Sequence, residues 1–367
     1  NDELLQWKEA SFTIGNVLNS SSPFRFIVRV TDDLDPWNMV DFAIDEFSVV
    51  FLPSMHQRSL FGRLSLWVKN IFIAPFIRYS KSPNIVHIHV SSDLSMWRKT
   101  SIGNMWSMLG VPVIYHTHGS KAKDFIEGSS SLTRWIISRR FRRASAIITL
   151  SEGWKNWYSD NLGIKLSKFA VLPTPIVLPA PHCLDQEERV DILYSGLMGH
   201  RKGTFDLIEA WARIPEEEKI GRKLHLIGNG EVASAREKSK LLNQEESCVV
   251  HGWVSEEEKI ELLKNCGTYV LPSHNEGLPM GLLEAMSWGL CPISTGVGAI
   301  PEIIKNGENG ILVSPGNVEE ISTAIRSIIN DLSMRESISS GAIETAEKHD
   351  WAAYMRNLIE LWEEKSK

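Results

Sequence analysis

The sequence predicts an α/β protein built from two doubly wound domains. Short apolar, β-rich segments alternate with amphipathic helical patterns along almost the whole chain of 367 residues, which is typical of βαβ units and parallel sheets. This length favours two domains, and residues 173–189, with four prolines and no periodicity, are typical of a linker between them. Ligands of such folds bind at the carboxyl ends of the parallel strands, where we expect a cleft.

The first domain is assigned to residues 1–175 and is expected to contain six strands. Their segments are FRFIVRV (24–30), FSVVFL (47–52), NIVHIHV (84–90), PVIYHTHG (112–119), SAIITLS (145–151) and FAVLP (169–173). Helical patterns lie between them, for example at 60–72 and at 132–144.

The second domain, residues 176–348, repeats this alternation. The expected strands are DILYSGL (191–197), KLHLIGNG (223–230), CVVHGWV (248–254), TYVLPS (268–273), CPISTGV (291–297) and GILVSP (310–315). Helices are expected from about Thr204, from Ser255 to Lys264 and in the segment 274–286, and helical material closes the chain at 349–367.

Composition indicates an ordinary globular protein, with 43% hydrophobic and 23% charged residues. The four cysteines form no CxxC pair, which argues against a disulfide framework or a zinc ribbon and favours a reducing compartment. The longest apolar run, from Leu64 to Ile77, is too short and too polar to span a bilayer. The chain begins NDELLQWKEASF, without Met, signal peptide or early strand, so we expect it to be trimmed.

Charge is distributed unevenly between the two halves. Residues 1–175 hold 20 Lys and Arg against 14 Asp and Glu, whereas residues 176–367 hold 19 against 31. The formal net charge of −6 is therefore the sum of a basic first half and an acidic second half.

A glycine-rich basic turn follows the first strand of the second domain, in SGLMGHRKGTFDLIEAW (195–211). Arg201 and Lys202 lie just before the free N–H groups of the next helix, and Gly203 allows close approach, so this turn is a candidate site for phosphate oxygens. A solvated basic turn is the alternative interpretation of so short a motif.

A second candidate anion site lies in HNEGLPMGLLEAM (274–286). Pro279 suits the first helical position, Gly277 and Gly281 remove side chains, and the free N–H groups of the helix start belong to Met280, Gly281 and Leu282.

Two glutamates flank this helix start at different depths. Glu276 lies in the loop before it and Glu284 one turn inside it, so together they could accept hydroxyl groups on either side of a bound phosphate. This spacing suggests a nucleoside diphosphate sugar, with Glu276 on the sugar and Glu284 on the ribose. Taken alone, Glu284 could also be a surface glutamate that interacts favourably with the helix dipole.

Several of these segments resemble the retaining GT-B glycosyltransferases of family 4. The run from Ser273 to Pro315 resembles their donor-binding signature with its E-x7-E pair, and SGLMGHRKG resembles their diphosphate turn. LIGNGE resembles the family's strand-to-glycine loop, and VVHGWVSEEEKIELLKNC resembles its base-binding strand and the following helix. In the first domain, YHTHG and ITLSEGW occupy the places of the family's HG loop and Ser-Glu strand end. The resemblance implies a GT-B fold, with two Rossmann-like domains facing a central cleft and a closing helix that crosses back to the first domain.

The resemblance also implies roles for individual residues. Arg201 and Lys202 would bind the diphosphate, Glu284 the ribose and Glu276 the donor sugar, and His118 would face that sugar across the cleft. The catalytic set is then His118, Glu276, Arg201 and Lys202. The remaining donor contacts expected are Gly196, Gly228, Trp253, Val254, Gly277, Leu278, Pro279, Met280, Gly281 and Leu282.

The chain departs from the family pattern in two places. Leu197 stands where the family usually has Arg after the glycine, and the first strand with its glycine-rich loop has no counterpart, which leaves the acceptor pocket undefined.

The implied reaction is a sugar transfer with retained configuration, from a nucleotide diphosphate sugar to a hydroxyl of a glycan or lipid-linked glycan. UDP is favoured as the nucleotide, with GDP as the alternative, and neither a metal nor a cofactor is expected. The acceptor would attack from the front face, and the leaving phosphate would serve as the base. The expected setting is bacterial surface polysaccharide synthesis in the cytoplasm. A catalytically silent nucleotide-sugar-binding subunit is the rival interpretation.

Other interpretations compete for particular motifs. Asp33 to Asp35 (DLD) could bind a metal as in GT-A transferases, although the following proline favours a turn. The pairs HIH (87–89) and HTH (116–118) could bind zinc, but no carboxylate ligand accompanies them at recognisable spacing. A dinucleotide-dependent oxidoreductase would need a third glycine in GNGEVA (228–233).

The basic segments of the first half suggest a charged partner. RRFRR (139–143) could bind nucleic acid, but we expect none, because the span from Arg58 to Lys81 mixes five basic residues with aromatic ones and is more typical of a membrane surface. A helix with a solvated basic face remains the alternative. The membrane interpretation would make the protein peripheral at the inner face of the plasma membrane and favour a lipid-linked acceptor.

Overall fold

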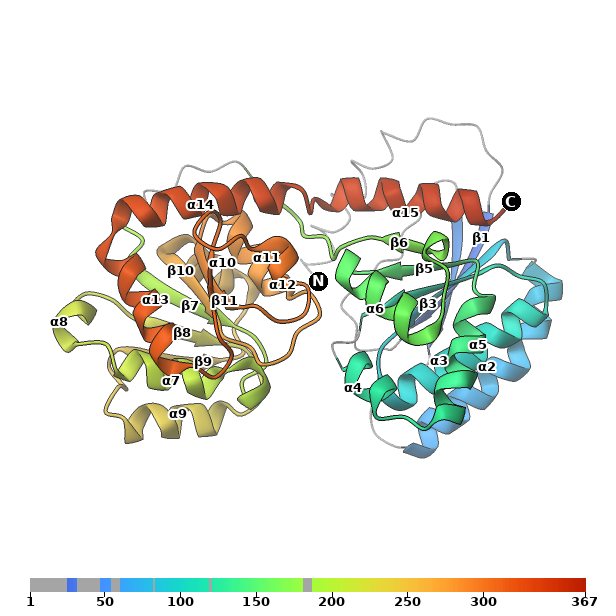
Figure 1. The fold of residues 1–367 in the computed structure, drawn as a ribbon, viewed down its shortest axis with the longest axis horizontal. Helices are drawn as coiled ribbons and strands as arrows, with labels where there is room; N and C mark the ends of the chain where they lie inside the picture. The colour runs from blue at the N-terminus through green and yellow to red at the C-terminus, as the bar shows by residue number, and fades with distance from the viewer. Residues whose placement is uncertain (1–24, 32–46, 54–59, 82, 119–120, 181–186) are drawn as a thin grey trace. The chain divides into compact units, whose positions relative to one another are not determined.

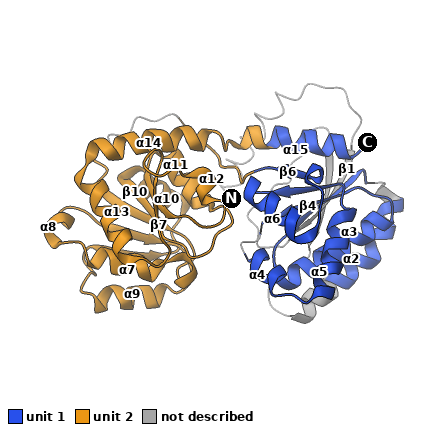
Figure 2. Cartoon of the chain, in the orientation of Figure 1, with its two compact units in different colours: residues 1–172, 355–367 blue, residues 173–354 orange. Residues whose placement is uncertain are grey.

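A computed structural model describes the chain except for residues 1–24, 32–46, 54–59, 82, 119–120 and 181–186. Within it the chain forms two compact units, one of residues 1–172 with 355–367 and one of residues 173–354 (Figure 2). The sequence predicts these boundaries at 175/176 and 348/349, a few residues away.

The first unit contains a parallel sheet of six described strands, and all six segments predicted for it are strands. These are β1 (Arg25–Thr31), β2 (Phe47–Pro53), β3 (Ile85–Val90), β4 (Val113–Thr117), β5 (Ala146–Thr149) and β6 (Phe169–Val171). The order β2-β1-β3-β4-β5-β6 corresponds to the flavodoxin-like arrangement. Residues 1–24 lie outside the described part, so the expectation of a missing first strand stays a prediction.

Three long helices cover one face of this sheet. They are α2 (Leu60–Lys81), α3 (Asp93–Met108) and α5 (Ser131–Arg143), accompanied by α4 (Ala122–Glu127), α6 (Glu152–Leu162) and the turn η2 (Leu166–Lys168). The connections β2 to β3, β3 to β4 and β4 to β5 all run in the same direction across the sheet, and right-handed crossovers then place their helices on the same side (Figure 1). Their buried side chains form one core with alternate residues of β3 and β4.

Helix α2 is longer than predicted, because it continues from residue 72 through Pro75 to Lys81. Proline usually ends or kinks a helix. Here Ala74 and Ile77, on either side of Pro75, are buried in the core, and this packing holds the helix beyond the proline.

The second unit contains a parallel sheet with the Rossmann strand order, and its six predicted strands are confirmed. These are β7 (Asp191–Ser195), β8 (Leu224–Ile227), β9 (Cys248–Gly252), β10 (Cys266–Leu271), β11 (Cys291–Thr295) and β12 (Ile311–Val313). In the order β12-β11-β10-β7-β8-β9, the direction of winding reverses between β10 and β7. Ligands of open α/β sheets bind at such a reversal.

The helices of the second unit include those that the site requires. They are α7 (Thr204–Ala212), α8 (Glu216–Lys219), α9 (Val232–Leu241), α10 (Glu256–Asn265), α11 (Met280–Ser287), α12 (Ile300–Ile303), α13 (Val318–Asn330) and α14 (Leu332–Glu347), with the turn η3 (His200–Lys202). Ser255 caps α10 in a reciprocal capping box with Glu258, which explains why the helix starts where the sequence indicated.

The closing helix α15 (Trp351–Lys365) begins in the second unit, and its residues from Met355 onward belong to the first. At its start the Ile176 N–H donates to the His349 carbonyl (2.8 Å), and the Trp351 N–H donates to the Ile176 carbonyl (3.0 Å). None of the described helices is long and apolar enough to cross a bilayer.

Candidate active site

A pocket of about 290 Å³ opens at the carboxyl edge of the second sheet, beside the reversal between β7 and β10. It is bounded by the ends of β7, β8 and β10, the loop after β9 and the first turns of α10 and α11. The lining residues are Ser195, Gly196, Lys202, Ile227, Gly228, Trp253, Val254, Ser255, Glu256, Lys259, Tyr269, Leu271, Pro279, Met280, Gly281 and Glu284. Nine of these were predicted donor contacts.

The glycine loop after β8 forms one wall by close backbone contact. Gly228 has a φ of +127°, and a Cβ added there would lie 2.0 Å from the carbonyl oxygen of Gly196. Only glycine fits this position, both for its conformation and for its space. The wall therefore presents backbone rather than side chains to the pocket.

The basic turn η3 packs against the loop that follows β10. Gly203 has a φ of +67°, and a Cβ there would lie 2.0 Å from the Pro272 carbonyl oxygen. The Arg201 carbonyl accepts the N–H of His274 (2.9 Å), and Arg201 Nη1 donates to the Asn275 carbonyl (3.0 Å). The two predicted anion sites are thus joined directly to each other.

Glu276 lies at the centre of this junction and is only 6% exposed. Its carboxylate accepts the Ser273 hydroxyl (2.7 Å) and pairs with Lys202 Nζ at 2.5 Å, while Arg201 Nη1 lies 3.9 Å away. Three of the four predicted catalytic residues therefore form one charge cluster. Lys202 lines the pocket, whereas Arg201 and Glu276 are not among the residues that line it.

Glu284 of α11 lines the pocket and pairs with Lys259 of α10, whose Nζ lies 2.7 Å from Glu284 Oε1. Lys259 also contacts Glu256 (2.9 Å). Burial lowers the pKa of Lys259, but the charges and hydrogen bonds of Glu284 and Glu256 outweigh burial, so the net pKa is raised. Lys259 is therefore charged, and it forms an ion pair with Glu284, the residue predicted to bind the ribose.

Sequence reasoning missed Lys259. It lies within the charged run SEEEK, which is typical of a solvated helix face. A usable signal existed, since α10 directly follows the loop after β9 and its first turn must therefore lie at the ligand edge of the sheet.

The start of α11 differs from the prediction in two details. Pro279 is the residue that precedes the helix, with ψ of 118°, rather than its first helical residue. The Leu282 N–H donates to the Pro279 carbonyl (3.2 Å), so it is not free; Met280 and Gly281 keep amides without a hydrogen bond to any described residue. Two orphan amides rather than three point out of this helix start.

Of four further residues predicted to contact the donor, two line the pocket and two are buried in the core. Trp253 is 77% exposed and lies with Val254 in the loop that lines the pocket, on the side predicted for the base. The side chains of Leu278 and Leu282 are buried in the core, at 7% and 0% exposure. They shape the loop and helix rather than contact a ligand through their side chains.

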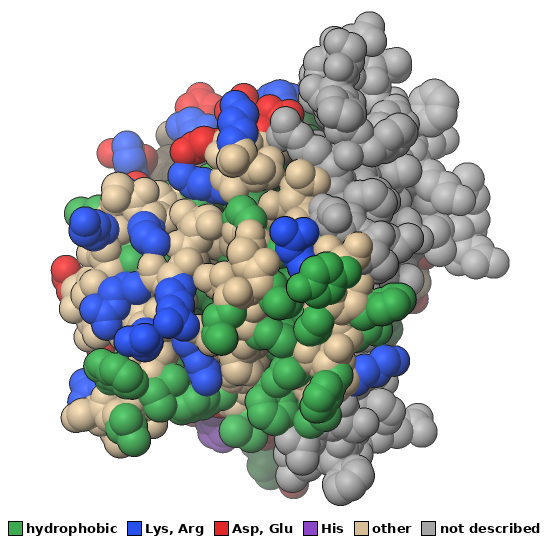
Figure 3. Space-filling model, turned by 90° about the vertical axis from the view of Figure 1, so that its right-hand side faces the viewer, with side chains coloured by type: hydrophobic (Ala, Val, Ile, Leu, Met, Phe, Trp, Pro, Cys, Tyr) green, Lys and Arg blue, Asp and Glu red, His purple; other side chains and the backbone are tan. Residues whose placement is uncertain are grey.

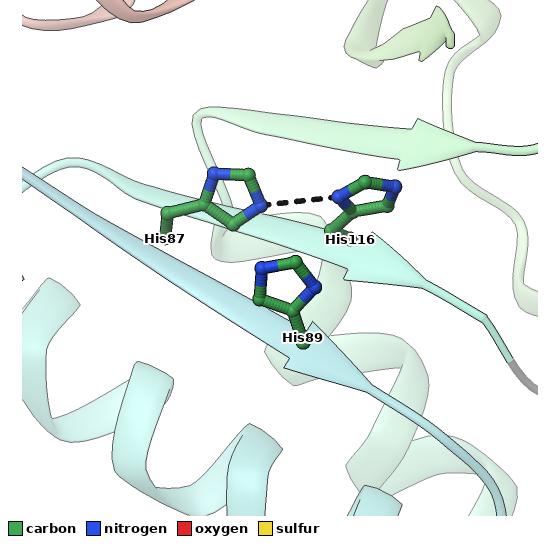
Figure 4. A group of neighbouring side chains, drawn as sticks. All are labelled: His87, His89 and His116. Atoms are coloured by element: carbon green, nitrogen blue, oxygen red, sulfur yellow. Dashed lines mark hydrogen bonds between the residues drawn. The ribbon is translucent and has the colours of Figure 1, made fainter. Parts of the chain in front are cut away.

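The predicted residue His118 belongs to the first unit, just after β4, and participates in a cluster of imidazoles. His87 and His89 on β3 face His116 on β4 (Figure 4). His87 Nε2 lies 3.2 Å from His116 Nδ1, and His89 Nδ1 lies 2.7 Å from His118 Nε2. The Trp362 indole N–H of α15 donates to His87 Nδ1 at 3.0 Å.

These contacts bear on the zinc alternative. One nitrogen each of His87, His89 and His116 lies within 4.8 Å of the others, close enough to consider a metal. An indole can only donate, so His87 Nδ1 is unprotonated and its Nε2 carries the proton that His116 accepts. Metal binding through His87 Nε2 would require an imidazolate, and the geometry favours a hydrogen-bonded chain instead. The DLD motif at 33–35 lies outside the described residues.

Two family models match successive parts of the chain. The model of Glycosyltransferase Family 4 matches residues 38–178, and that of Glycosyl transferases group 1 matches residues 184–345. The chain belongs to the GT4-type glycosyltransferases of the GT-B fold.

Known relatives of this glycosyltransferase agree with that assignment. It is 24% identical to an uncharacterised glycosyltransferase of Methanocaldococcus jannaschii over 88% of this chain and 87% of that protein. It is 30% identical to the capsular polysaccharide biosynthesis glycosyltransferase CapM of Staphylococcus aureus, over 59% of this chain and 55% of CapM. Several other curated relatives are matched over less than two thirds of their own length.

The same fold occurs in Anabaena HepE, solved in complex with UDP and glucose. The TM-score is 0.72 at 17% identity, and the match covers 93% of this chain and 100% of that one. At this identity the likeness supports the GT-B fold alone.

Proposed function

We propose that this glycosyltransferase transfers a sugar, with retention of configuration, from a nucleotide diphosphate sugar to a hydroxyl of a glycan or lipid-linked glycan. One observation carries the proposal: two cation–carboxylate pairs, Lys202–Glu276 and Lys259–Glu284, flank the same helix start beside the pocket. A diphosphate at that start would meet two free amides and Lys202, with one carboxylate available on each side.

The helix start and the basic turn fit the leaving group. Free amides and the positive end of a helix stabilise anionic phosphate oxygens, and Lys202 adds a full charge at the pocket wall. As the bond to the sugar breaks, negative charge grows on the diphosphate, and groups held in place in advance stabilise it without reorganisation. No protein nucleophile and no metal are then required.

The two carboxylates would divide the ligand between them. Glu284 lies on the side of the exposed loop of Trp253, where the base and ribose would bind. Contacts with Ser273 and Lys202 hold the Glu276 carboxylate in one orientation. Its lone pairs that are not used in these contacts therefore point in a fixed direction, and a carboxylate fixed in this way can orient the hydroxyl groups of a donor sugar. The expectation that His118 contacts the donor sugar stays a prediction.

We favour UDP as the nucleotide and bacterial surface polysaccharide as the product. HepE is solved with UDP and glucose, and CapM serves capsular polysaccharide biosynthesis. These relatives support the proposal, and GDP sugars are the alternative donors.

A panel of UDP- and GDP-sugars, read by thermal shift and by release of free nucleotide, tests the proposal. A nucleotide that binds only the folded state raises the melting temperature with concentration. We expect one nucleotide class to raise it and one of its sugars to be transferred or slowly hydrolysed, with the same rate in EDTA.

The silent-subunit rival gives a different result in the same assay. It requires a nucleotide-dependent rise in melting temperature with no turnover of any donor, whatever acceptor is added. Absence of any rise for all nucleotides would contradict both the proposal and this rival.

A further inference from the structure

The helices α2, α3 and α5 of the first unit form one continuous outer surface. Arg78 Nε of α2 donates to the Leu109 carbonyl at the end of α3 (3.2 Å), and Arg143 Nη1 of α5 donates to Asn104 Oδ1 of α3 (2.6 Å). Helix α3 therefore connects its two neighbours, and all three cover the same side of the sheet (Figure 1).

Helix α2 exposes a row of large aromatic side chains. Phe72, Phe76 and Tyr79 are 78%, 72% and 84% exposed, and their spacing of four and three residues places them along one face of the helix. Ala74 and Ile77 bury the opposite face in the core. Single exposed hydrophobic residues are common, whereas an aligned row of three on one helix indicates an interaction surface.

Helix α5 adds arginines and a tryptophan to the same surface. Trp135 is 54% exposed, and the Arg139 guanidinium lies 5.6 Å from the centre of its ring. Arg134, Arg139, Arg142 and Arg143 are all exposed. Arginine stems and tryptophan rings both suit a boundary between apolar and aqueous surroundings.

The charge around these helices is strongly positive. Residues 47–172 contain 17 Lys and Arg against 5 Asp and Glu, and the 22 residues of α2 contain no acidic residue. Figure 3 shows one side of the molecule, where hydrophobic side chains lie beside groups of Lys and Arg on the described surface.

We propose that the outer surface of α2, α3 and α5 binds an anionic lipid membrane. Anionic headgroups complement its arginines, and the aromatic row of α2 can enter the boundary between headgroups and acyl chains. A nucleic acid would complement the arginines but would leave the aromatic row, one helix away, without a role. The inference does not depend on the donor or on the reaction in the second unit.

Vesicle sedimentation of the purified full chain tests the inference directly. We expect the protein to pellet with vesicles of phosphatidylcholine containing about one third phosphatidylglycerol, and to stay in the supernatant with phosphatidylcholine alone. Raising the salt concentration should release it partially, because screening weakens only the electrostatic part of the binding.

Two double variants separate the two components. Phe72→Ser with Phe76→Ser should weaken vesicle binding roughly tenfold by removing apolar contact, and Arg139→Glu with Arg142→Glu roughly a hundredfold by reversing two charges. Matched controls lie on the second unit: Ile220→Ser with Leu241→Ser, and Lys240→Glu with Lys305→Glu, which alter equally exposed residues. These controls should bind vesicles as the parent does.

Three outcomes would overturn the inference. The first is that the protein does not bind anionic vesicles. The second is that the α2 and α5 variants, with the parent's melting temperature, both bind vesicles as the parent does. The third is that the protein binds an oligonucleotide but no vesicles. Release of nucleotide from the donor, measured on the same samples without lipid, shows separately whether the proposed reaction has failed.

Discussion

The polar side chains at the carboxyl edges of the two sheets form different kinds of contact. In the second unit the edge carries full charges in pairs, Lys202 with Glu276 and Lys259 with Glu284. In the first unit it carries imidazoles joined to one another and to Trp362 by hydrogen bonds. The lysine of an ion pair can leave its carboxylate and bind an anionic ligand instead. Hydrogen bonds between imidazoles mainly hold these side chains in place. Variants of the first kind should therefore change binding and turnover, whereas variants of the second kind, apart from those of the predicted catalytic residue His118, should change mainly stability.

The largest effect is expected for Glu276→Ala. Removing the carboxylate that would orient the donor sugar should lower the transfer rate roughly a hundredfold to a thousandfold. Nucleotide affinity should stay nearly unchanged, because Lys202 loses only an internal partner and remains available to phosphate. Initial rates with a saturating donor, together with calorimetric titration of the free nucleotide, measure both quantities.

The controls for Glu276 separate its chemistry from its packing. Glu276→Gln keeps the size of the side chain and an oxygen that can accept from Ser273, so it should fold normally and still lose transfer. Glu261→Ala removes an exposed glutamate of α10 and should change neither quantity. A Glu276→Gln variant that transfers sugar at the parent's rate would contradict the assigned role.

Glu284→Ala is expected to weaken nucleotide binding by about ten- to a hundredfold, the range for losing a hydrogen-bonded charged group. Its effect on the free nucleotide should be much larger than that of Glu276→Ala, because only Glu284 is assigned to the ribose. Titration of both variants with the same nucleotide makes the comparison. Equal losses of affinity would disprove the division of labour between the two glutamates.

The second unit could be predicted further than the first. Glycines such as Gly203 and Gly228 mark close backbone approaches, and the twelve strands of the described residues follow from their apolar segments. Lys259 was missed because its partner Glu284 lies on another helix, and α2 was drawn too short at Pro75. The contact from Trp362 to His87 spans 275 residues, a separation over which local patterns carry no information.

Trp362→Phe tests the first unit's side of the comparison. The indole N–H that His87 accepts would be lost from a buried site, which should cost about 1–3 kcal/mol of unfolding free energy. Nucleotide affinity should not change. Urea unfolding and nucleotide titration of the same variant check both statements. Trp351→Phe, on the same helix, removes another buried indole without touching His87 and serves as the control. A Trp362→Phe variant with intact stability and weakened nucleotide binding would contradict the expectation that the imidazole chain contributes to stability and not to binding.

Lys259→Met should have a smaller effect on the pocket. The variant keeps the apolar stem but releases Glu284 from its partner, so the donor KM should rise several-fold to about tenfold while kcat stays nearly constant. A purely structural role would instead lower the melting temperature and leave KM unchanged. Lys264→Met, at an exposed position on the same helix, is the matched control.

The smallest expected effect concerns His349, just before α15. Burial lowers the pKa of His349, although a hydrogen bond to the Thr174 backbone opposes the shift. The unfolded chain therefore takes up a proton near the ordinary histidine pKa of about 6.5, and the folded chain does so only at lower pH. Stability from this residue is complete above that pH and decreases as the pH falls below it. Urea unfolding between pH 7.5 and 5.5 should show a shallower decrease for His349→Gln than for the parent. Identical slopes for the two proteins would mean that His349 is protonated as easily in the folded chain as in the unfolded one.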